Sequence, residues 1–479
     1  MAEGQRWNVL FLISHDQGIA VSSMAGEGPE AHEHLPTPNL QRIADEGVLL
    51  TRHFGTAPMC SPARSSLMTG MYPHDNGIVG LTHMGHQYDP GVKTVIHAFT
   101  EAGYRTMLVG LEHESRGIVK QARLDQLGYQ ESRVSELVPP AHALPKHVDE
   151  ALKELISSNK PWWLTVGTRE VHRSWRCDAE ITPENVKIPC YLPESPDIKE
   201  EISNFTRCLK TYDRFIGQVL DMLDKHGVSD NTIVIATTDH GIALPNAKGL
   251  LYDFGCHTLM LFRGPGDIIR RGLRVNALAS SIDFAPTICE LCSVQPLDSF
   301  MGSSYARFLN GNHAGEPFRE HVFNENTFAD IYNPIRAVRS ERFRYIHNYV
   351  DFSVALGPPN DVQKGAAYRA WKELALATYG EKRAVEELYD LEKDPCQRHN
   401  LANEDPGHPE LVHLRGVLDD WLKFTRDPIR NGPYPIPSIA VVDNACEFPH
   451  LAGHQRVKRN TIIGFLQQVI ASKKRKVRK

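Results

Sequence analysis

The chain has 479 residues, a formal net charge of −5 and 41% hydrophobic residues, which is typical of a globular protein with a sizeable core. The charge gives no sign of a nucleic-acid partner, and no apolar stretch reaches the roughly 20 residues that a membrane-spanning helix needs. The polar start of the chain lacks the features of a leader peptide, so we expect a cytoplasmic protein without a membrane partner. The nine cysteines are scattered and odd in number, which argues against a disulfide framework.

Strand-like and helix-like segments alternate in the first two thirds of the chain. Apolar runs predict strands at residues 8–14, 105–109, 162–167 and 232–237. Helical periodicity marks residues 37–47 and 199–226. Such alternation predicts an α/β fold with a mostly parallel sheet sandwiched by helices. Active sites of such sheets lie beyond the carboxyl ends of the strands.

The pattern changes after about residue 315. Short strands are expected at residues 321–325, 335–339, 343–349 and 387–391, and an amphipathic helix at residues 411–424. We therefore expect three parts: an α/β domain of residues 1–315, a smaller α+β subdomain with a small antiparallel sheet at residues 316–455, and a basic tail at residues 456–479.

Residues 57–70 carry the most specific pattern of the chain and read APMCSPARSSLMTG. Cys60 by itself is either a reactive thiolate at a helix start or a small buried cysteine. Neither interpretation explains the residues around it. The segment resembles the C-x-P-x-R signature of type I sulfatases and the S-L-x-T-G that follows it. In that family the cysteine is oxidised to formylglycine.

Further segments resemble the same family in the same order. They are residues 8–16, 37–48, 239–241, 283–287 and 387–401, so the resemblance covers about residues 7–405. Residues 72–77 and 333–338 look most like N-sulfoglucosamine sulfohydrolase-like (heparan N-sulfatase-like) bacterial sulfatases. The resemblance implies an alkaline-phosphatase-like fold, in which a smaller C-terminal α+β subdomain follows the main domain.

The resemblance also implies roles for matching residues. The catalytic set is Cys60, Arg64, His113, His172 and Lys248. The metal-binding set is His15, Asp16, Cys60, Asp239 and His240. The residues expected to line the substrate pocket are His83, His86 and Arg336.

The chemistry explains why these residue types occur together. An aldehyde hydrate offers one hydroxyl that attacks sulfur and a second that later expels sulfate, which splits a hard step into two. A divalent cation polarises the sulfate, and its carboxylate ligands favour Ca²⁺, with Mg²⁺ or Mn²⁺ as alternatives. A formylglycine-generating maturase is an implied partner.

Two positions depart from the family pattern. His15 stands where the family has an aspartate, and an imidazole ligand suits Mn²⁺ or Zn²⁺ better than Ca²⁺. Leu111 stands where the family has a lysine that contacts the sulfate. The predicted pocket is therefore not the standard one.

We expect the chain to hydrolyse a sulfate ester or sulfamate on a small sulfated saccharide. One alternative is a phosphodiesterase or phosphonate monoester hydrolase of the same superfamily, because relatives use formylglycine on phosphorus. The other is a pseudoenzyme that binds sulfated glycans without cleaving them, which the changes at His15 and Leu111 motivate.

Overall fold

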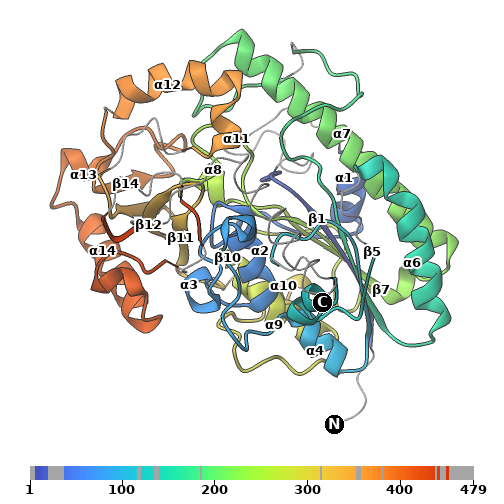
Figure 1. Cartoon of the computed structure of the whole chain (residues 1–479). Helices are drawn as coiled ribbons and strands as arrows, with labels where there is room; N and C mark the ends of the chain where they lie inside the picture. Colours follow the sequence, from blue (N-terminus) through green and yellow to red (C-terminus); the bar gives the residue numbers. More distant parts are fainter. Residues whose placement is uncertain are drawn as a thin grey trace, which may run out of the picture.

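A computed structural model describes the greater part of the chain, with a central sheet between two layers of helices (Figure 1). The described residues are 6–19, 37–115, 120–133, 140–183, 186–312, 316–351, 358–379, 381–436, 440–442 and 449–451. The basic tail predicted at residues 456–479 lies outside them. Among the described helices, none combines the length and apolar character that a bilayer-spanning segment requires.

The central sheet has eight strands in the order β5-β4-β6-β1-β7-β8-β2-β9. Their bounds are β1 (Asn8–Ser14), β2 (Gly47–Leu50), β4 (Arg105–Gly110), β5 (Glu131–Arg133), β6 (Trp162–Gly167), β7 (Thr232–Thr238), β8 (Met260–Arg263) and β9 (Leu273–Val275). Only β8 runs antiparallel to its neighbours, β7 and β2. The predicted mostly parallel sheet is confirmed, and its four predicted strands are β1, β4, β6 and β7.

Side chains of β1 enter two separate cores, because successive residues of a strand point to opposite faces. Leu10 and Leu12 join one core, while Val9, Phe11 and Ile13 join the other. The first core is covered by α1 (Pro38–Asp45), α6 (Pro145–Ser157) and α7 (Pro196–Lys225). The second is covered by α2 (Cys60–Thr69), α4 (Val95–Glu101), α5 (Lys120–Leu127), α9 (Phe284–Leu291) and α10 (Ala306–Leu309). Burial on both faces explains the continuous apolar runs of these strands.

A second, antiparallel sheet follows the first and has its own core. It consists of β11 (Val322–Phe328), β12 (Tyr332–Arg339), β13 (Phe343–Asn348) and β14 (Glu386–Asp390). Helix α14 (Pro409–Phe424) packs on this sheet, as the amphipathic pattern predicted. Between β13 and β14 the chain forms α11 (Asn360–Gln363) and α12 (Ala366–Tyr379), and α12 lies beside α7 (Figure 1).

The remaining elements are short. They are β3 (His53–Phe54) paired with β10 (Ala279–Ser280), α3 (Pro73–Asn76), α8 (Asp253–Cys256) and α13 (Leu401–Glu404). The 3₁₀ turns are η2 (Thr82–Met84), η3 (Ala141–Ala143), η5 (Ser229–Asn231), η6 (Ser281–Asp283), η8 (Pro428–Asn431) and η10 (Pro449–Leu451).

Two disulfides correct the prediction made from the cysteine count. They join Cys177 to Cys208, and Cys190 to Cys396. The scattered spacing hid both pairs because their partners lie 31 and 206 positions apart in the sequence. Disulfides persist in oxidising compartments and are rare in the cytosol, so these bridges disagree with the expected cytoplasmic location.

A candidate active site at the carboxyl end of the central sheet

The carboxyl ends of four strands meet at one edge of the central sheet. Ile13 of β1 pairs with Gly167 of β6 on one side and with Thr237 of β7 on the other, and Gly110 ends β4 beside Gly167. The loops that follow these strands are therefore neighbours in space. This shared edge brings together all the residues of the predicted metal-binding and catalytic sets.

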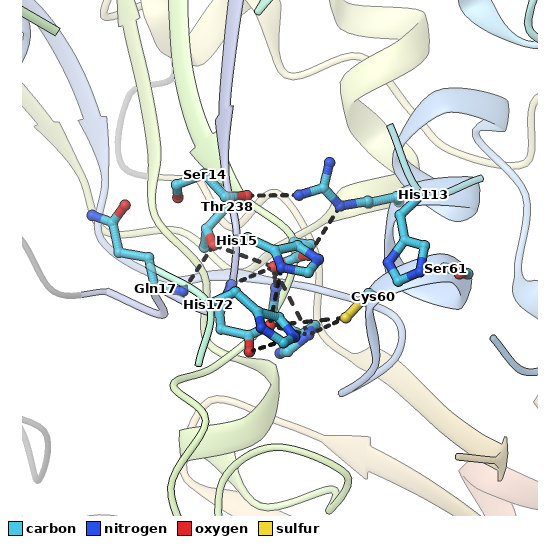
Figure 2. A network of polar contacts seen from close by, with 12 residues as sticks. Ser14, His15, Gln17, Cys60, Ser61, His113, His172 and Thr238 are labelled. Atoms are coloured by element: carbon cyan, nitrogen blue, oxygen red, sulfur yellow. Dashed lines mark hydrogen bonds and ion pairs between the residues drawn. The ribbon is translucent and has the colours of Figure 1, made fainter. Parts of the chain in front are cut away.

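Cys60 is the first residue of α2, and its side chain points at the ends of β1 and β7 (Figure 2). Its sulfur lies 3.3 Å from Nε2 of His240 and 3.8 Å from Oδ1 of Asp16. Cys60 is only 2% exposed, and burial raises the pKa of its thiol above the ordinary value. The unmodified residue is therefore a thiol at neutral pH, which argues against a thiolate nucleophile at this position.

Arg64 lies one helical turn after Cys60 and is fully buried. Its Nε donates to Oδ2 of Asp239 at 2.9 Å, and its Nη2 donates to the carbonyl oxygen of Ser14, also at 2.9 Å. One guanidinium thus joins α2 to the ends of β1 and β7. Its planar fork of donors makes these two contacts at once, which a lysine could not do.

Asp16 sits at the centre of the site with a left-handed backbone, φ +58°. Its Oδ2 accepts a hydrogen bond from Nζ of Lys248 at 2.7 Å, and its Oδ1 lies 3.0 Å from Nε2 of His240. Its own backbone N–H donates to Oδ1 of Asp239 at 2.9 Å. Burial opposes ionisation of Asp16, but the Lys248 ammonium and neighbouring imidazoles outweigh burial and hold its pKa well below the ordinary value.

His15 is stacked on His172, with ring centroids 4.7 Å apart (Figure 2). Nε2 of His15 lies 3.2 Å from Oδ2 of Asp239, yet neither ring nitrogen has a hydrogen-bond partner although the residue is 3% exposed. Burial lowers the pKa of this imidazole well below 6.5, so it is neutral and has a free lone pair. A buried imidazole without a hydrogen bond fits a ligand to a cation.

The donor atoms of four residues lie within 4.8 Å of one another: His15, Asp16, Cys60 and Asp239. Two carboxylates, an imidazole and the side chain of residue 60 fit a divalent cation. His240, the fifth predicted ligand, contacts Asp16 and Cys60 but is not in this set. Its Nδ1 lies 2.8 Å from the carbonyl oxygen of Gly241, which fixes the orientation of the ring.

The site opens into a cavity of about 690 Å³. Its lining residues are Met59, Cys60, Leu81, His83, His113, His172, Lys248, Asp330, Pro359, Asn360, Asp361 and Lys364. On one wall, Nε2 of His172 lies 3.4 Å from Nζ of Lys248. The rings of His83 and His113, which also line the cavity, are stacked, and Nδ1 of His83 lies 3.4 Å from Nε2 of His113.

Several cavity-lining residues from the C-terminal part of the chain were not predicted from the sequence. Asp361 accepts a hydrogen bond from Lys248 at 2.8 Å and lies 3.7 Å from Nε2 of His172. Asp330 and Lys364 also line the cavity. No motif surrounds these residues, and more than a hundred positions separate Asp361 from Lys248, so the sequence contained no signal for them.

Two residues predicted to line the pocket lie elsewhere. His86 is fully buried against Phe328, with ring centroids 5.0 Å apart. Arg336 is fully buried in β12, where Nε lies 2.5 Å from Oδ2 of Asp427. A buried guanidinium needs a paired carboxylate, and Asp427 provides it away from the cavity.

Leu111 occupies the position where the family has a lysine. Its side chain lines a small enclosed space together with Arg64 and Glu114, and it is not among the residues that line the large cavity. Among the described residues of the cavity wall, the cations are Lys248 and Lys364.

Comparisons with known proteins agree with this arrangement. A family model described as sulfatase matches residues 7–294, and one described as N-sulphoglucosamine sulphohydrolase, C-terminal, matches residues 245–356. An ulvan-active sulfatase of Formosa agariphila is 26% identical over 88% of this chain and 76% of its own length. Human N-sulphoglucosamine sulphohydrolase is 26% identical over 88% of this chain and 91% of its own length.

A solved structure in complex with its substrate D-glucosamine-2-N,6-O-disulfate shares the fold. It superposes with a TM-score of 0.67 at 18% identity, and the match covers 90% of this chain and 99% of the other. The shared fold extends over both sheets, because the matched part includes nearly the whole described chain.

Proposed function

The chain belongs to the sulfatase family of the alkaline phosphatase superfamily, and from this premise we propose that it removes sulfate from a sulfated sugar with residue 60 as its nucleophile. It is a sulfuric ester hydrolase. The named activities of its relatives, on ulvan and on N-sulphoglucosamine, support a sugar as the group that carries the sulfate.

The observation that carries the proposal is the position of Cys60. The residue begins a helix, lies between Asp16 and His240, and opens into the cavity. Because Cys60 stands at the cysteine of the C-x-P-x-R signature, we propose that a maturase converts it to formylglycine. The hydrated aldehyde then supplies one hydroxyl for attack on sulfur and a second that expels sulfate.

The residues around Cys60 divide the remaining work. Arg64 positions Asp239 and the end of β1 through its two hydrogen bonds. Lys248 faces the cavity and stabilises negative charge on the sulfate oxygens. Lys248, 3.4 Å from Nε2 of His172, transfers a proton through this imidazole to the leaving oxygen, and His113, which also lines the cavity, accepts a proton from the hydrate.

We propose that His15, Asp16 and Asp239 hold a divalent cation together with residue 60, with His240 beside them. A bound cation polarises the sulfate and lowers the pKa of the nucleophile. The buried imidazole of His15, without a hydrogen bond, supports its role as a ligand.

Peptide mass spectrometry of residue 60 tests the proposal directly. Conversion to formylglycine is expected to lower the peptide mass by about 18 Da. The matured protein is expected to hydrolyse p-nitrophenyl sulfate or a sugar sulfate in preference to phosphate diesters and phosphonates, and Cys60→Ala to abolish this. A preference for phosphorus substrates would favour the phosphonate monoester hydrolase alternative. Glycan binding without turnover, with Cys60 unmodified, would favour a pseudoenzyme.

We also propose that the protein works in an oxidising compartment. The Cys177–Cys208 and Cys190–Cys396 disulfides support this location over the cytoplasm. Cell fractionation checks it: recovery of the fully reduced protein from the cytosol would contradict it.

A further inference from the structure

The cavity has a wall with two carboxylates, Asp361 and Asp330, that the proposed reaction does not use. Asp361, at the start of α11, exposes 27% of its side chain, and Asp330 lines the same cavity. A carboxylate close to a site that binds sulfate anions is unfavourable, because like charges repel more strongly away from bulk water. The presence of this wall therefore needs an explanation in terms of the rest of the substrate.

Hydrogen bonds and core packing hold the segment of Asp330 and Asp361 in position. Oδ2 of Asp330 accepts a hydrogen bond from the backbone N–H of Asn360 at 2.7 Å, which joins Asp330 to the start of α11. Glu201 of α7 accepts a hydrogen bond from the backbone N–H of Ala366, and Arg173 donates to the same carboxylate at 2.7 Å. Trp371 of α12 is 1% exposed in the core that α7 covers. Asp361 thus belongs to a packed, ordered part of the fold.

The segment that carries Asp361 lies outside the matched family models. Those models cover residues 7–294 and 245–356, whereas α11 and α12 span Asn360–Gln363 and Ala366–Tyr379. The residues that bind and attack sulfate come from the matched part. Asp361 therefore lies in a segment that the two family models do not describe, whereas Asp330 lies within the matched residues 245–356.

The position of Lys248 suggests how the sulfate and the sugar ring of a substrate are arranged in the cavity. Its ammonium lies between Oδ2 of Asp16 at 2.7 Å and Oδ2 of Asp361 at 2.8 Å. If the sulfate lies next to Cys60 and Lys248, the attached ring occupies the rest of the cavity, which Asp361 and Asp330 also line. Carboxylates there accept hydrogen bonds from hydroxyl or ammonium groups, but a carboxylate on the ring would lie against them without a proton to share.

We propose that Asp361 selects the substrate: the enzyme accepts a sulfated sugar that presents hydroxyl or ammonium groups to this wall and rejects a sulfated uronic acid. This inference rests on the proposed function, because it assumes that the sulfate of a sugar binds beside residue 60. Asp361 acts by direct contact with the ring and by electrostatic exclusion, while Lys364 lies exposed at the mouth of the cavity.

Calorimetric binding to the full chain carrying Cys60→Ala tests the inference without turnover. The probes are pairs of monosaccharides with the same ring and the same sulfate position, at O2, O3, O4 or N2. One member of each pair has a hydroxymethyl group on C5 and the other a carboxylate. The pairs are measured with Asp361 intact, with Asp361→Asn and with Glu373→Gln, which removes a charge from an exposed position on α12.

With Asp361 intact, the hydroxymethyl member is expected to bind on the order of tenfold more tightly than the carboxylate member. Asp361→Asn is expected to reduce this ratio to about threefold or less, and Glu373→Gln to leave it unchanged. Asp361→Asn removes the ion pair with Lys248, and this change affects sulfate binding equally for both members of a pair. The ratio of their affinities therefore reports the selection between the two rings and not sulfate binding.

The possible results distinguish the selection by Asp361 from the proposed sulfatase function. If both members bind and Asp361→Asn leaves their ratio unchanged, or if the carboxylate member binds as tightly as the other, the selection by Asp361 is wrong while the proposed function stands. If the Cys60→Ala chain binds no sulfated monosaccharide and the matured chain hydrolyses none, the proposed function is wrong and the inference falls with it.

Discussion

Nε of Arg64 donates to Oδ2 of Asp239 at 2.9 Å, with both side chains almost completely removed from solvent. A buried pair of this kind is costly to break, since either charge left alone lies in a medium that solvates it poorly. The pair also joins the helix that starts with Cys60 to a proposed metal ligand. We therefore expect stability and the proposed activity to depend on the same contact.

Replacement of Arg64 by lysine is expected to impair both properties. Lysine keeps the charge but cannot reach Asp239 and the carbonyl oxygen of Ser14 together, so kcat should fall by about a hundredfold or more. In urea unfolding, Arg64→Lys should lower the free energy of unfolding by about 1–3 kcal/mol, and Arg64→Ala should lower it by about 3–5 kcal/mol. Arg42→Lys, in a partly exposed ion pair with Glu46, should cost less than about 1 kcal/mol. Wild-type kinetics in Arg64→Lys would contradict the proposed positioning role.

His15 is expected to decide which metal the protein retains. One imidazole among the carboxylates favours Mn²⁺ or Zn²⁺ over Ca²⁺, the ion that the carboxylates by themselves favour. After dialysis against equal concentrations of the three ions, elemental analysis should find mainly Mn²⁺ or Zn²⁺ in the wild type. His15→Asp should shift the content toward Ca²⁺, and His83→Asn, outside the proposed ligand set, should not. Retention of Ca²⁺ alone by the wild type would exclude His15 as the deciding ligand.

The Cys190–Cys396 disulfide is expected to contribute substantially to stability, because it closes a loop of 206 positions and joins the two halves of the chain. The double variant Cys190→Ala/Cys396→Ala should lose about 2–4 kcal/mol in urea unfolding. The corresponding change at Cys177 and Cys208 should cost about 1–2 kcal/mol less, since that loop spans only 31 positions. The comparison is made with and without reductant. Equal losses for both pairs would contradict an explanation by loop entropy.

His53 is expected to make the protein sensitive to acid. The residue is 1% exposed, its Nδ1 lies 2.7 Å from Oγ1 of Thr258, and burial lowers the pKa of its imidazole to about 3, with a smaller contribution from His257. The folded state therefore binds fewer protons than the unfolded state between pH 6.5 and 3. The stability contributed by neutral His53 is complete above pH 6.5 and is lost as the pH falls toward 3.

The expected slope is about 1.4 kcal/mol per pH unit from this one residue. Urea unfolding between pH 6 and pH 4 should give a shallower dependence for His53→Gln by about this amount, even if the variant is less stable at pH 7. His142→Gln, at an exposed position, serves as the control and should leave the slope unchanged. A parallel dependence in wild type and His53→Gln would show that His53 titrates normally in the folded state.

The sequence by itself determined the fold class and the chemical centre. Apolar runs located β1, β4, β6 and β7, because strands buried on both faces must be continuously apolar. The segment from Cys60 to Arg64 predicted the proposed nucleophile, because its match to the family signature lies within five consecutive residues. Both depend on residues that are close together in the sequence, so both can be recognised without the tertiary structure.

Only the tertiary structure decided what surrounds that centre. The burial of Arg336 and His86 away from the cavity, and the approach of Asp361 to Lys248, depend on how the second sheet and α11 pack against the rest of the chain. The pairing of Cys190 with Cys396 depends on the same packing. Such contacts join residues separated by tens to hundreds of positions, and packing places them without any local pattern of residues, which is why the cavity wall that contains Asp361 could not be predicted from the sequence.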